Sequence, residues 1–270
     1  MTTASQNPSA RVFCVANQKG GVGKTTTAIN LAAALSIYGQ RVLLVDLDPQ
    51  GNATMGSGID KNLATVNLYQ VLIGEARVAD ARLRSETGRY DVLPSNRDLS
   101  GAEIDLVGME NREMQLKSAL AQVSDEYDFI LIDCPPTLSL LTLNGLACAH
   151  GVVIPMQCEY FALEGLSDLV NSIKRIYRNL NTSLELIGLL RVMFDQRVTL
   201  QQQVSEQLIS HFGDKVFSTV IPRNVRLAEA PSHGMPGVVY DKSSRGAKAY
   251  LQFGEELIRR VGGRVRRRAA

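Results

Sequence analysis

Lysine, glycine and threonine residues that could bind phosphate are concentrated in one short segment. Residues 17–27 read NQKGGVGKTTT and lie between an apolar run and a helical run over residues 28–37. Glycines let backbone N–H groups approach a phosphate closely, and a helix N-terminus adds partial positive charge. Lys24 could reach the β- and γ-phosphates of a nucleotide, and the Thr25 hydroxyl could ligate Mg²⁺. The segment therefore predicts a phosphate-binding loop.

The loop departs from the usual G-x-x-x-x-G-K-[ST] pattern at its first position. Gln18 stands where that pattern has glycine, and a second lysine, Lys19, precedes Gly20. The competing interpretation is a glycine-rich turn that carries surface lysines. The apolar strand before the loop and the helix after it favour the phosphate site.

Three carboxylates follow apolar strands. Asp46 and Asp48 end one strand within VDLDPQGN, and Asp133 ends another within FILIDCPP. Each aspartate alone is typical of a helix cap or a turn. In open α/β sheets, however, ligands bind beyond the carboxyl ends of strands, and an aspartate there is typical of Mg²⁺ sites in P-loop enzymes. The three together favour a nucleotide site.

Short apolar runs that alternate with amphipathic stretches must position these residues. We expect strands at Val12–Asn17, Arg41–Asp46, Tyr90–Pro94, Phe129–Asp133, Gly151–Met156, Leu186–Phe194 and near Val216–Ile221. Apolar residues at helical spacing predict a helix over Leu163–Leu180. This alternation predicts an α/β fold with a single doubly wound, mostly parallel sheet flanked by helices.

Composition bounds the remaining possibilities. The 270 residues are 45% hydrophobic and 21% charged, which excludes wholesale disorder and suits one domain over residues 11–261. We expect a flexible N-terminus over 1–10, without a signal peptide, and a basic flexible tail over 262–270. The net charge is only +2 because the rest of the chain is slightly acidic and offsets the basic tail. Such a tail suggests either a phosphate-rich partner or a solubilising end.

The four cysteines lie in apolar runs without a C-x-x-C pair. Buried free thiols in a reducing cytoplasm are therefore favoured over a set of disulfides. The uncharged stretch Cys134–Cys158 is interrupted by prolines, Asn144 and His150, so it predicts a loop, a core helix and a buried strand rather than a membrane span.

Further blocks are more specific than the loop alone. Besides KGGVGKTT, DLDPQGN and IDCPP, the sequence contains PMQCEYFALEGL (155–166), IPRNVRLAEAPSHGMP (221–236) and YDKSSRGAKAY (240–250). Together these blocks resemble the deviant Walker ATPases of the ParA/MinD superfamily, and within it the chromosomal ParA-type partition ATPases. The resemblance covers about residues 11–258 and implies a P-loop ATPase fold with ATP and Mg²⁺ as cofactors.

The resemblance implies a nucleotide-binding role for each matching residue. The ATP-binding residues would be Lys19, Gly20, Gly21, Val22, Gly23, Lys24, Thr25 and Thr26, with Pro222, Arg223 and Asn224 beside adenine. Lys24 would bind phosphate within its own subunit, whereas Lys19 would reach the nucleotide of a partner subunit. Thr26 would bind the α-phosphate.

The resemblance also implies how hydrolysis is arranged. Thr25 would ligate Mg²⁺, Asp133 would hold it through water, and Asp46 would support its hydration shell. Asp48 would position the attacking water, so Lys19, Lys24 and Asp48 are the implied catalytic residues. The presence of Asp48 argues against a co-regulator that only binds DNA.

By the same resemblance, an ATP-dependent homodimer would bind double-stranded DNA without sequence preference. Arg197 and Arg226 match the family's DNA-contacting arginines, and Lys242, Arg245 and Lys248 are plausible additions. A ParB-type centromere-binding protein would stimulate slow hydrolysis and release the DNA. The expected location is the cytoplasm, at the nucleoid, with no membrane partner.

Two other members of the superfamily are alternatives. A MinD-like membrane-bound positioning ATPase needs an amphipathic C-terminal helix with bulky apolar residues, and LIRRVGGRVRRRAA has few. An iron–sulfur reductase of the nitrogenase type needs paired cluster cysteines, which the four cysteines do not provide.

Overall fold

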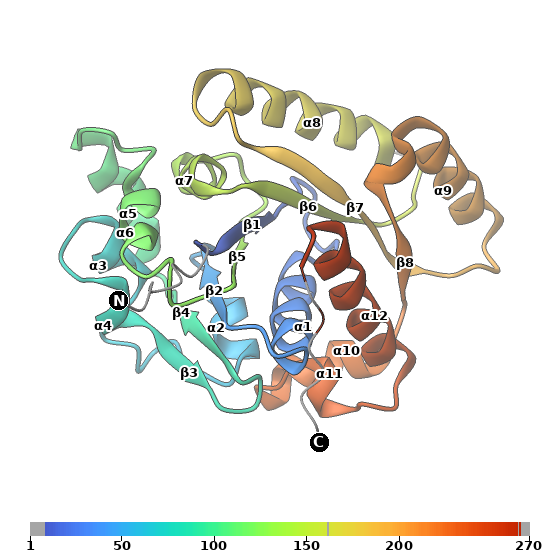
Figure 1. The fold of residues 1–270 in the computed structure, drawn as a ribbon, viewed down its shortest axis with the longest axis horizontal. Helices are drawn as coiled ribbons and strands as arrows, with labels where there is room; N and C mark the ends of the chain where they lie inside the picture. Colours follow the sequence, from blue (N-terminus) through green and yellow to red (C-terminus); the bar gives the residue numbers. More distant parts are fainter. Residues whose placement is uncertain (1–8, 161, 264, 266–270) are drawn as a thin grey trace, which may run out of the picture.

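The computed structural model describes residues 9–160, 162–263 and 265, and its core is one eight-stranded sheet (Figure 1). Its strands are β1 Arg11–Val15, β2 Val42–Asp46, β3 Leu83–Ser85, β4 Tyr90–Leu93, β5 Phe129–Asp133, β6 Gly151–Met156, β7 Glu185–Phe194 and β8 Val216–Pro222. They lie in the order β3-β4-β2-β5-β1-β6-β7-β8. Every neighbouring pair is parallel except β3 and β4, which are antiparallel.

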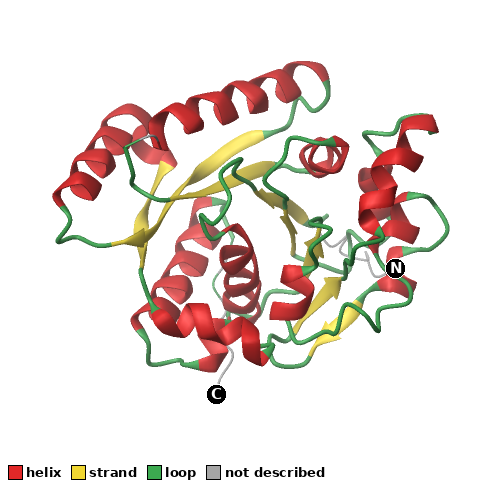
Figure 2. Cartoon of the chain, turned by 180° about the vertical axis from the view of Figure 1, so that it is seen from behind, coloured by secondary structure: helices red, strands yellow, loops and turns green. Residues whose placement is uncertain are grey.

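Helices connect the strands and cover both faces of the sheet (Figure 2). The α-helices are α1 Lys24–Ile37, α2 Asn52–Gly56, α3 Leu68–Leu72, α4 Val78–Ala81, α5 Leu99–Asp105, α6 Gln115–Ala121, α7 Leu140–Cys148, α8 Ala162–Asn179, α9 Thr199–Phe212, α10 Val225–Glu229, α11 Gly237–Tyr240 and α12 Arg245–Arg260. Short 3-10 helices are η1 Leu106–Gly108, η2 Gly213–Lys215 and η3 Ala230–His233.

The apolar residues form two cores, one on each side of the sheet. One core lies under α3 to α9, and the other lies under α1, α2 and α10 to α12. α1 and α12 run side by side in the centre of Figure 1. Both faces of the central strands are therefore buried, which is why their sequences are continuous apolar runs.

The predicted fold class is confirmed, with local differences. β1 ends at Val15, two residues earlier than expected, because the Asn17 side chain turns the chain by accepting a hydrogen bond from the Lys19 N–H at 3.0 Å. α1 begins at Lys24, four residues earlier than the predicted helix, directly after the left-handed Gly23 (φ 78°) at its N-cap. β3 was not predicted, since three residues carry too little pattern.

The expectations for the cysteines and for the uncharged stretch are confirmed, whereas those for the chain ends are not tested. All four cysteines are buried and free, and the uncharged stretch forms a loop, α7 and β6, as expected. Among the described residues, no helix is both long and apolar enough to span a membrane. The predicted flexible ends, 1–10 and 262–270, lie mostly outside the described residues and stay predictions.

Candidate nucleotide-binding site

The loop between β1 and α1 has the backbone of an anion-binding turn. Gly21 (φ 73°) and Gly23 (φ 78°) are both left-handed, a conformation that costs other residues energy. A Cβ atom at Gly20 or Gly21 would meet nothing within 4 Å, so the loop's outer surface is open. The buried Val22 anchors the loop, and the 14-residue α1 presents its free N–H groups at Lys24.

The two lysines of the loop have opposite surroundings. Lys24 is only 8% exposed and its Nζ donates to the Lys19 carbonyl oxygen at 3.2 Å. Burial lowers the pKa of Lys24, while the nearby Asp133 raises it. The Lys19 side chain is 52% exposed and forms an ion pair with Glu159 at 2.5 Å. Lys24 therefore occupies the interior of the loop, and Lys19 lies on its outer surface.

Two of the predicted aspartates meet at neighbouring strand ends. Asp46 on β2 is paired in register with Asp133 on β5, and Asp133 is paired with Val15, the last residue of β1. The carboxylates therefore lie where the phosphate loop leaves the sheet. Both aspartates thus lie at carboxyl ends of strands, where ligands bind in open α/β sheets; the structure adds that their two strands are neighbours.

Asp133 is a buried carboxylate without hydrogen-bond partners. Both of its oxygens lack a partner in the described structure. Burial raises its pKa well above the ordinary value, and Asp46 raises it further, whereas Thr25 and Lys24 lower it. An unpartnered carboxylate costs free energy unless a cation or donor meets it. The residues present therefore fit a hydrated Mg²⁺ held between Thr25 and Asp133.

Asp46 differs because its carboxylate is already held. Its Oδ2 accepts hydrogen bonds from the Thr54 N–H and hydroxyl, both at 2.7 Å, and its Oδ1 accepts one from the Asp48 N–H at 3.4 Å. Burial raises the pKa of Asp46 to about 7, and the Thr54 bonds act against that rise. Asp46 thus joins β2 to α2 and shapes the loop that carries Asp48.

Asp48 is half-buried at the turn after β2. Its Oδ1 accepts a hydrogen bond from the Gln50 N–H at 2.9 Å, and its carbonyl oxygen accepts one from the Ser95 hydroxyl at 2.9 Å. The remaining carboxylate oxygen can still accept a proton or orient a water. This geometry is compatible with the predicted role of Asp48.

A pocket of about 310 Å³ adjoins the loop. Pro222, Arg223 and Asn224, predicted to flank adenine, line it together with Gly23 and Thr26. The apolar side chains of Val192, Ile221 and Leu227 also line it, which suits the flat face of a base. The structure thus brings together two predicted segments that are about 200 residues apart in the sequence.

Sequence reasoning missed several residues that hold the loop. Asn17 donates through Nδ2 to the Pro155 carbonyl oxygen at 2.8 Å, which ties the loop to β6. Gln157 donates to the Gly21 carbonyl oxygen at 3.3 Å and to the Met193 sulfur at 3.0 Å. Met193 is left-handed (φ 50°), a rare conformation for this residue type. Such contacts between distant segments leave no pattern in one sequence.

The five basic residues predicted to contact DNA are exposed, and they divide into two places. Arg226 on α10 pairs with Glu229 at 2.8 Å and with Asp241 at 3.6 Å, next to Lys242 and the start of α12. Arg245 and Lys248 follow on α12. Arg197 lies in the loop after β7 and pairs with Asp195 at 2.7 Å. β7 and β8 are neighbours, and Phe194 is in register with Pro222, so both places lie at one edge of the sheet.

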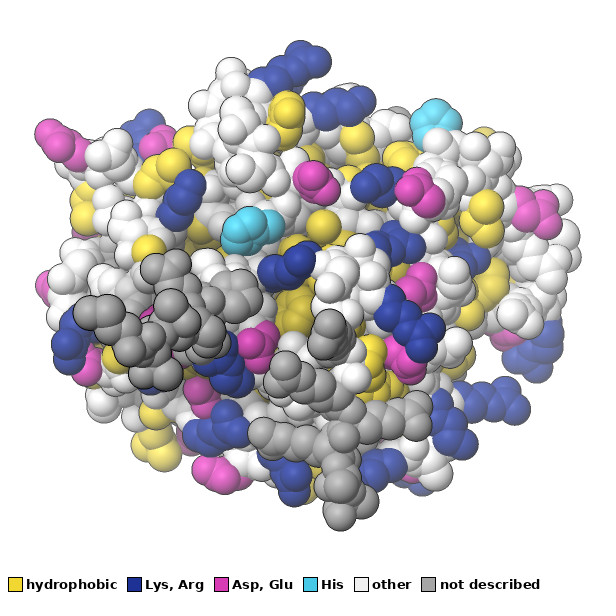
Figure 3. Space-filling view, viewed as in Figure 1, with side chains coloured by type: hydrophobic (Ala, Val, Ile, Leu, Met, Phe, Trp, Pro, Cys, Tyr) yellow, Lys and Arg dark blue, Asp and Glu magenta, His cyan; other side chains and the backbone are white. Residues whose placement is uncertain are grey.

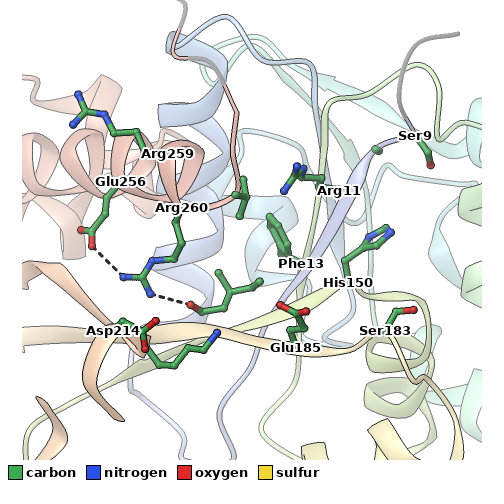
Figure 4. Close-up of a pocket in the computed structure, with 14 residues that line it drawn as sticks. Ser9, Arg11, Phe13, His150, Ser183, Glu185, Asp214, Glu256, Arg259 and Arg260 are labelled. Carbon is green, nitrogen blue, oxygen red and sulfur yellow. Dashed lines mark hydrogen bonds and ion pairs between the residues drawn. The ribbon is translucent and has the colours of Figure 1, made fainter. Parts of the chain in front are cut away.

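Elsewhere the surface charge is mixed. On the face in Figure 3, lysine and arginine side chains alternate with acidic ones. A hollow of about 1050 Å³ lies at the opposite ends of the strands, lined by Arg11, His150 and Glu185 among others (Figure 4). Arg260 there donates to the Ile187 carbonyl oxygen at 2.9 Å and pairs with Glu256 at 3.5 Å. This hollow lacks the glycine turn and helix N-terminus of the phosphate loop, so we assign the nucleotide to the loop instead.

Comparison with known proteins identifies the family. A family model described as an AAA domain matches residues 10–186. The chain is 51% identical to the sporulation initiation inhibitor protein Soj of Bacillus subtilis, over 92% of this chain and 98% of that protein. It is 49% identical to the chromosome partitioning protein ParA of Caulobacter vibrioides, over 95% of this chain and 96% of that protein.

A solved structure carries the same fold with nucleotide bound. Cobyrinic acid a,c-diamide synthase from Mycobacterium smegmatis, with bound ADP and magnesium, superposes with a TM-score of 0.83 at 38% identity. The match covers 97% of this chain and 100% of that one. A structure of the same protein holds an ATP analogue and magnesium. ATP and Mg²⁺ are thus the cofactors consistent with these relatives and with the residues around Lys24 and Asp133.

The phosphate loop with its two lysines, the aspartates at adjoining strand ends and the close similarity to Soj and ParA agree with one another. The chain therefore belongs to the ParA/Soj family of chromosome-partitioning proteins, within the ParA/MinD superfamily of P-loop ATPases.

Proposed function

We propose that this protein is a DNA-segregation ATPase whose ATP-bound homodimer binds nucleoid DNA without sequence preference. The observation that carries the proposal is the contrast between its two loop lysines. Lys24 is buried within the loop, whereas the Lys19 side chain is 52% exposed and paired with the exposed Glu159. Because Lys24 already serves the subunit's own phosphates, the exposed Lys19 can exchange its pair with Glu159 for the phosphates of a second subunit.

The residues around the loop have separate roles in ATP hydrolysis. The N–H groups of Gly20 to Gly23 and the Lys24 ammonium bind the phosphates, while Thr26 binds the α-phosphate. Thr25 and Asp133 hold Mg²⁺, which when bound neutralises charge on the phosphate oxygens. Asp48 orients the attacking water, and Asp46 keeps the Asp48 loop in place through its bonds to Thr54.

Pro222, Arg223 and Asn224 form one wall of the adjoining pocket and would hold adenine there. The next residues along the chain carry the DNA surface. Arg226 follows two residues after Asn224, so a base in the pocket and a phosphate on Arg226 would share one short segment.

Non-specific DNA binding needs cations that meet backbone phosphates rather than groups that read bases. Arg197, Arg226, Lys242, Arg245 and Lys248 are all exposed and supply such cations. Arg197 and Arg226 each form an exposed ion pair with a nearby carboxylate. Such pairs contribute little to stability, so a DNA phosphate can replace the carboxylate. A ParB-type centromere-binding protein would stimulate hydrolysis and release the dimer, and the protein would reside in the cytoplasm at the nucleoid.

The membrane-bound alternative has less support. α12 is amphipathic, but its apolar residues, among them Tyr250, Phe253 and Leu257, are buried against α1 and β8. This helix therefore has no free apolar face to insert into a bilayer.

The test is DNA binding by charge-reversed variants. Arg226→Glu and Arg197→Glu should remove ATP-dependent binding to a random-sequence duplex while ATP-driven dimerisation, measured by sedimentation, persists. Arg77→Glu is the matched control, because Arg77 forms an exposed i,i+3 pair with Asp80 as Arg226 does with Glu229. Deleting residues 262–270 tests the basic tail. Loss of binding in the deletion, with full binding in both arginine variants, would show that the tail is the DNA site.

A further inference from the structure

A buried asparagine joins the phosphate-loop helix to the segment that carries the basic residues. Asn30 lies on α1 and is only 3% exposed. Its Nδ2 donates to the Thr26 carbonyl oxygen at 2.8 Å, and its Oδ1 accepts from the Val238 N–H at 3.0 Å. Val238 is fully buried on α11, 208 residues further along the chain.

The packing around Asn30 leaves it little freedom. A Cβ atom on Gly237 would lie 3.1 Å from the Asn30 Oδ1 and 2.5 Å from a Leu227 methyl group. A side chain at Gly237 would therefore have to displace Leu227 and crowd the Asn30 Oδ1 where α11 passes over α1. Because Leu227 lies on α10, one tight contact includes α1, α10 and α11 together. A shift in the first turn of α1 must move this segment or break the Asn30 bonds.

A second set of contacts connects the Asp48 loop to the same segment. Asp46 holds Thr54 in the middle of α2, and α2 packs against η3. A Cβ atom on Gly58 would lie 2.7 Å from the Gly234 carbonyl oxygen, and one on Gly234 would lie 2.9 Å from the Gly58 Cα. Only glycine at both positions allows this approach.

The Asn30 hydrogen bond and the contact between Gly58 and Gly234 both end in residues 225–241, which we call the relay segment. Arg226 lies near its start, and its guanidinium pairs with Asp241 at the end. Lys242 and Arg245 follow directly. The relay segment thus joins both phosphate-facing elements to the basic surface. Resting on the function proposed above, we infer that Asn30 is a positioning residue that transmits the placement of the phosphate loop to that basic surface.

Hydrogen exchange tests the inference without relying on DNA. In the wild-type chain, Mg²⁺ and a slowly hydrolysed ATP analogue should slow amide exchange across residues 225–241. Asn30→Leu removes both hydrogen bonds at similar volume and should abolish this slowing at saturating nucleotide. Asn30→Ser, which is smaller and cannot bridge the gap, should give the same loss if the leucine variant does not fold.

Thr27→Val is the matched control. Thr27 is also buried on α1, but its hydroxyl bonds to the Tyr250 hydroxyl of α12 at 3.0 Å instead of to α11. This variant should lose stability yet keep the nucleotide response of the relay segment. Equal loss in Thr27→Val would show that general packing, and not Asn30, carries the effect, and would overturn the inference.

DNA binding then separates the inference from the proposed function. The ratio of DNA affinities with ATP and with ADP should fall about tenfold or more in Asn30→Leu, while ATP affinity stays near wild type. An unchanged exchange response in both Asn30 variants, or no response of the wild-type relay segment, refutes the inference. A response that depends on Asn30 in a protein that never binds DNA leaves the inference standing and refutes the proposed function.

Discussion

Replacing Thr54 tests how the Asp48 loop is held. The Thr54 hydroxyl donates to the buried Asp46 at 2.7 Å and accepts from the Ser95 N–H at 3.0 Å. The Ser95 hydroxyl in turn donates to the Asp48 carbonyl oxygen at 2.9 Å. Thr54→Val keeps the shape of the side chain but removes its donor and its acceptor. It thereby breaks the connection between Asp46, Ser95 and Asp48.

The expected loss of stability follows from these bonds. A hydrogen bond to a charged group contributes about 1.5 kcal/mol or more, and the buried N–H left unpaired costs about another 1.5 kcal/mol. The sum is about 3 kcal/mol. For a chain of this length the entropy of unfolding is about 0.6 kcal/mol per kelvin, so Tm should fall by about 5 °C. Because Thr54 opposes the raised pKa of Asp46, which is about 7, the variant should also raise that pKa further.

Calorimetry at pH 8 and steady-state ATP hydrolysis are the assays. Thr54→Val should lower kcat while ATP affinity changes little, because the Asp48 loop shifts and the phosphate loop does not. Thr54→Ser keeps the hydroxyl and is the matched control, with a smaller loss of Tm and near-normal kcat. A drop in Tm below about 1 °C, or equal effects of valine and serine, would refute the role of this hydrogen-bonded group.

Four other changes have definite expected outcomes. Lys24→Ala should abolish ATP binding in calorimetric titration, since the ammonium is the main charge inside the loop; wild-type affinity would refute the phosphate-loop assignment. Asp48→Ala should dimerise with ATP but hydrolyse little, prolonging DNA binding; a monomer in sedimentation, or full turnover, contradicts this. Glu229→Gln should raise DNA affinity a few-fold in low salt, because Arg226 loses a competing carboxylate; unchanged affinity would mean that Arg226 does not meet phosphate. Burial and the cations Arg11 and Lys117 lower the pKa of His150 from 6.5, so its contribution to stability is present above pH 6.5 and lost as the pH falls below it. His150→Asn can still accept the hydrogen bond from the Val12 N–H. In this variant, Tm measured by calorimetry should depend less on pH in that range.

The sequence predicted the parts of the site that lie close to strand ends. Asp46 and Asp133 each follow an apolar strand, and ligands in open α/β sheets bind beyond such strand ends. That β2 and β5 are neighbours, which brings the two residues together, was known only from the structure. The glycines and Lys24 could be assigned because the strand, the glycine turn and the helix are contiguous in the chain.

Contacts between distant segments could not be predicted. The Asn30 bond to Val238, the Gln157 bond to Gly21 and the left-handed Met193 depend on how loops pack, and no spacing in one sequence encodes that. The pocket residues Pro222 to Asn224 were assigned only through the family resemblance. Their place beside Gly23 required the structure.

Binding of a random-sequence DNA duplex with ATP, with ADP and without nucleotide, measured on wild type and on Lys19→Ala, tests the central claim most directly. We predict tight, salt-sensitive binding by the wild-type chain with ATP alone, and its loss in Lys19→Ala although the variant still binds ATP. Equal binding in all three nucleotide conditions, or ATP-dependent binding by Lys19→Ala at wild-type strength, would contradict the proposal of a DNA-binding dimer assembled through Lys19.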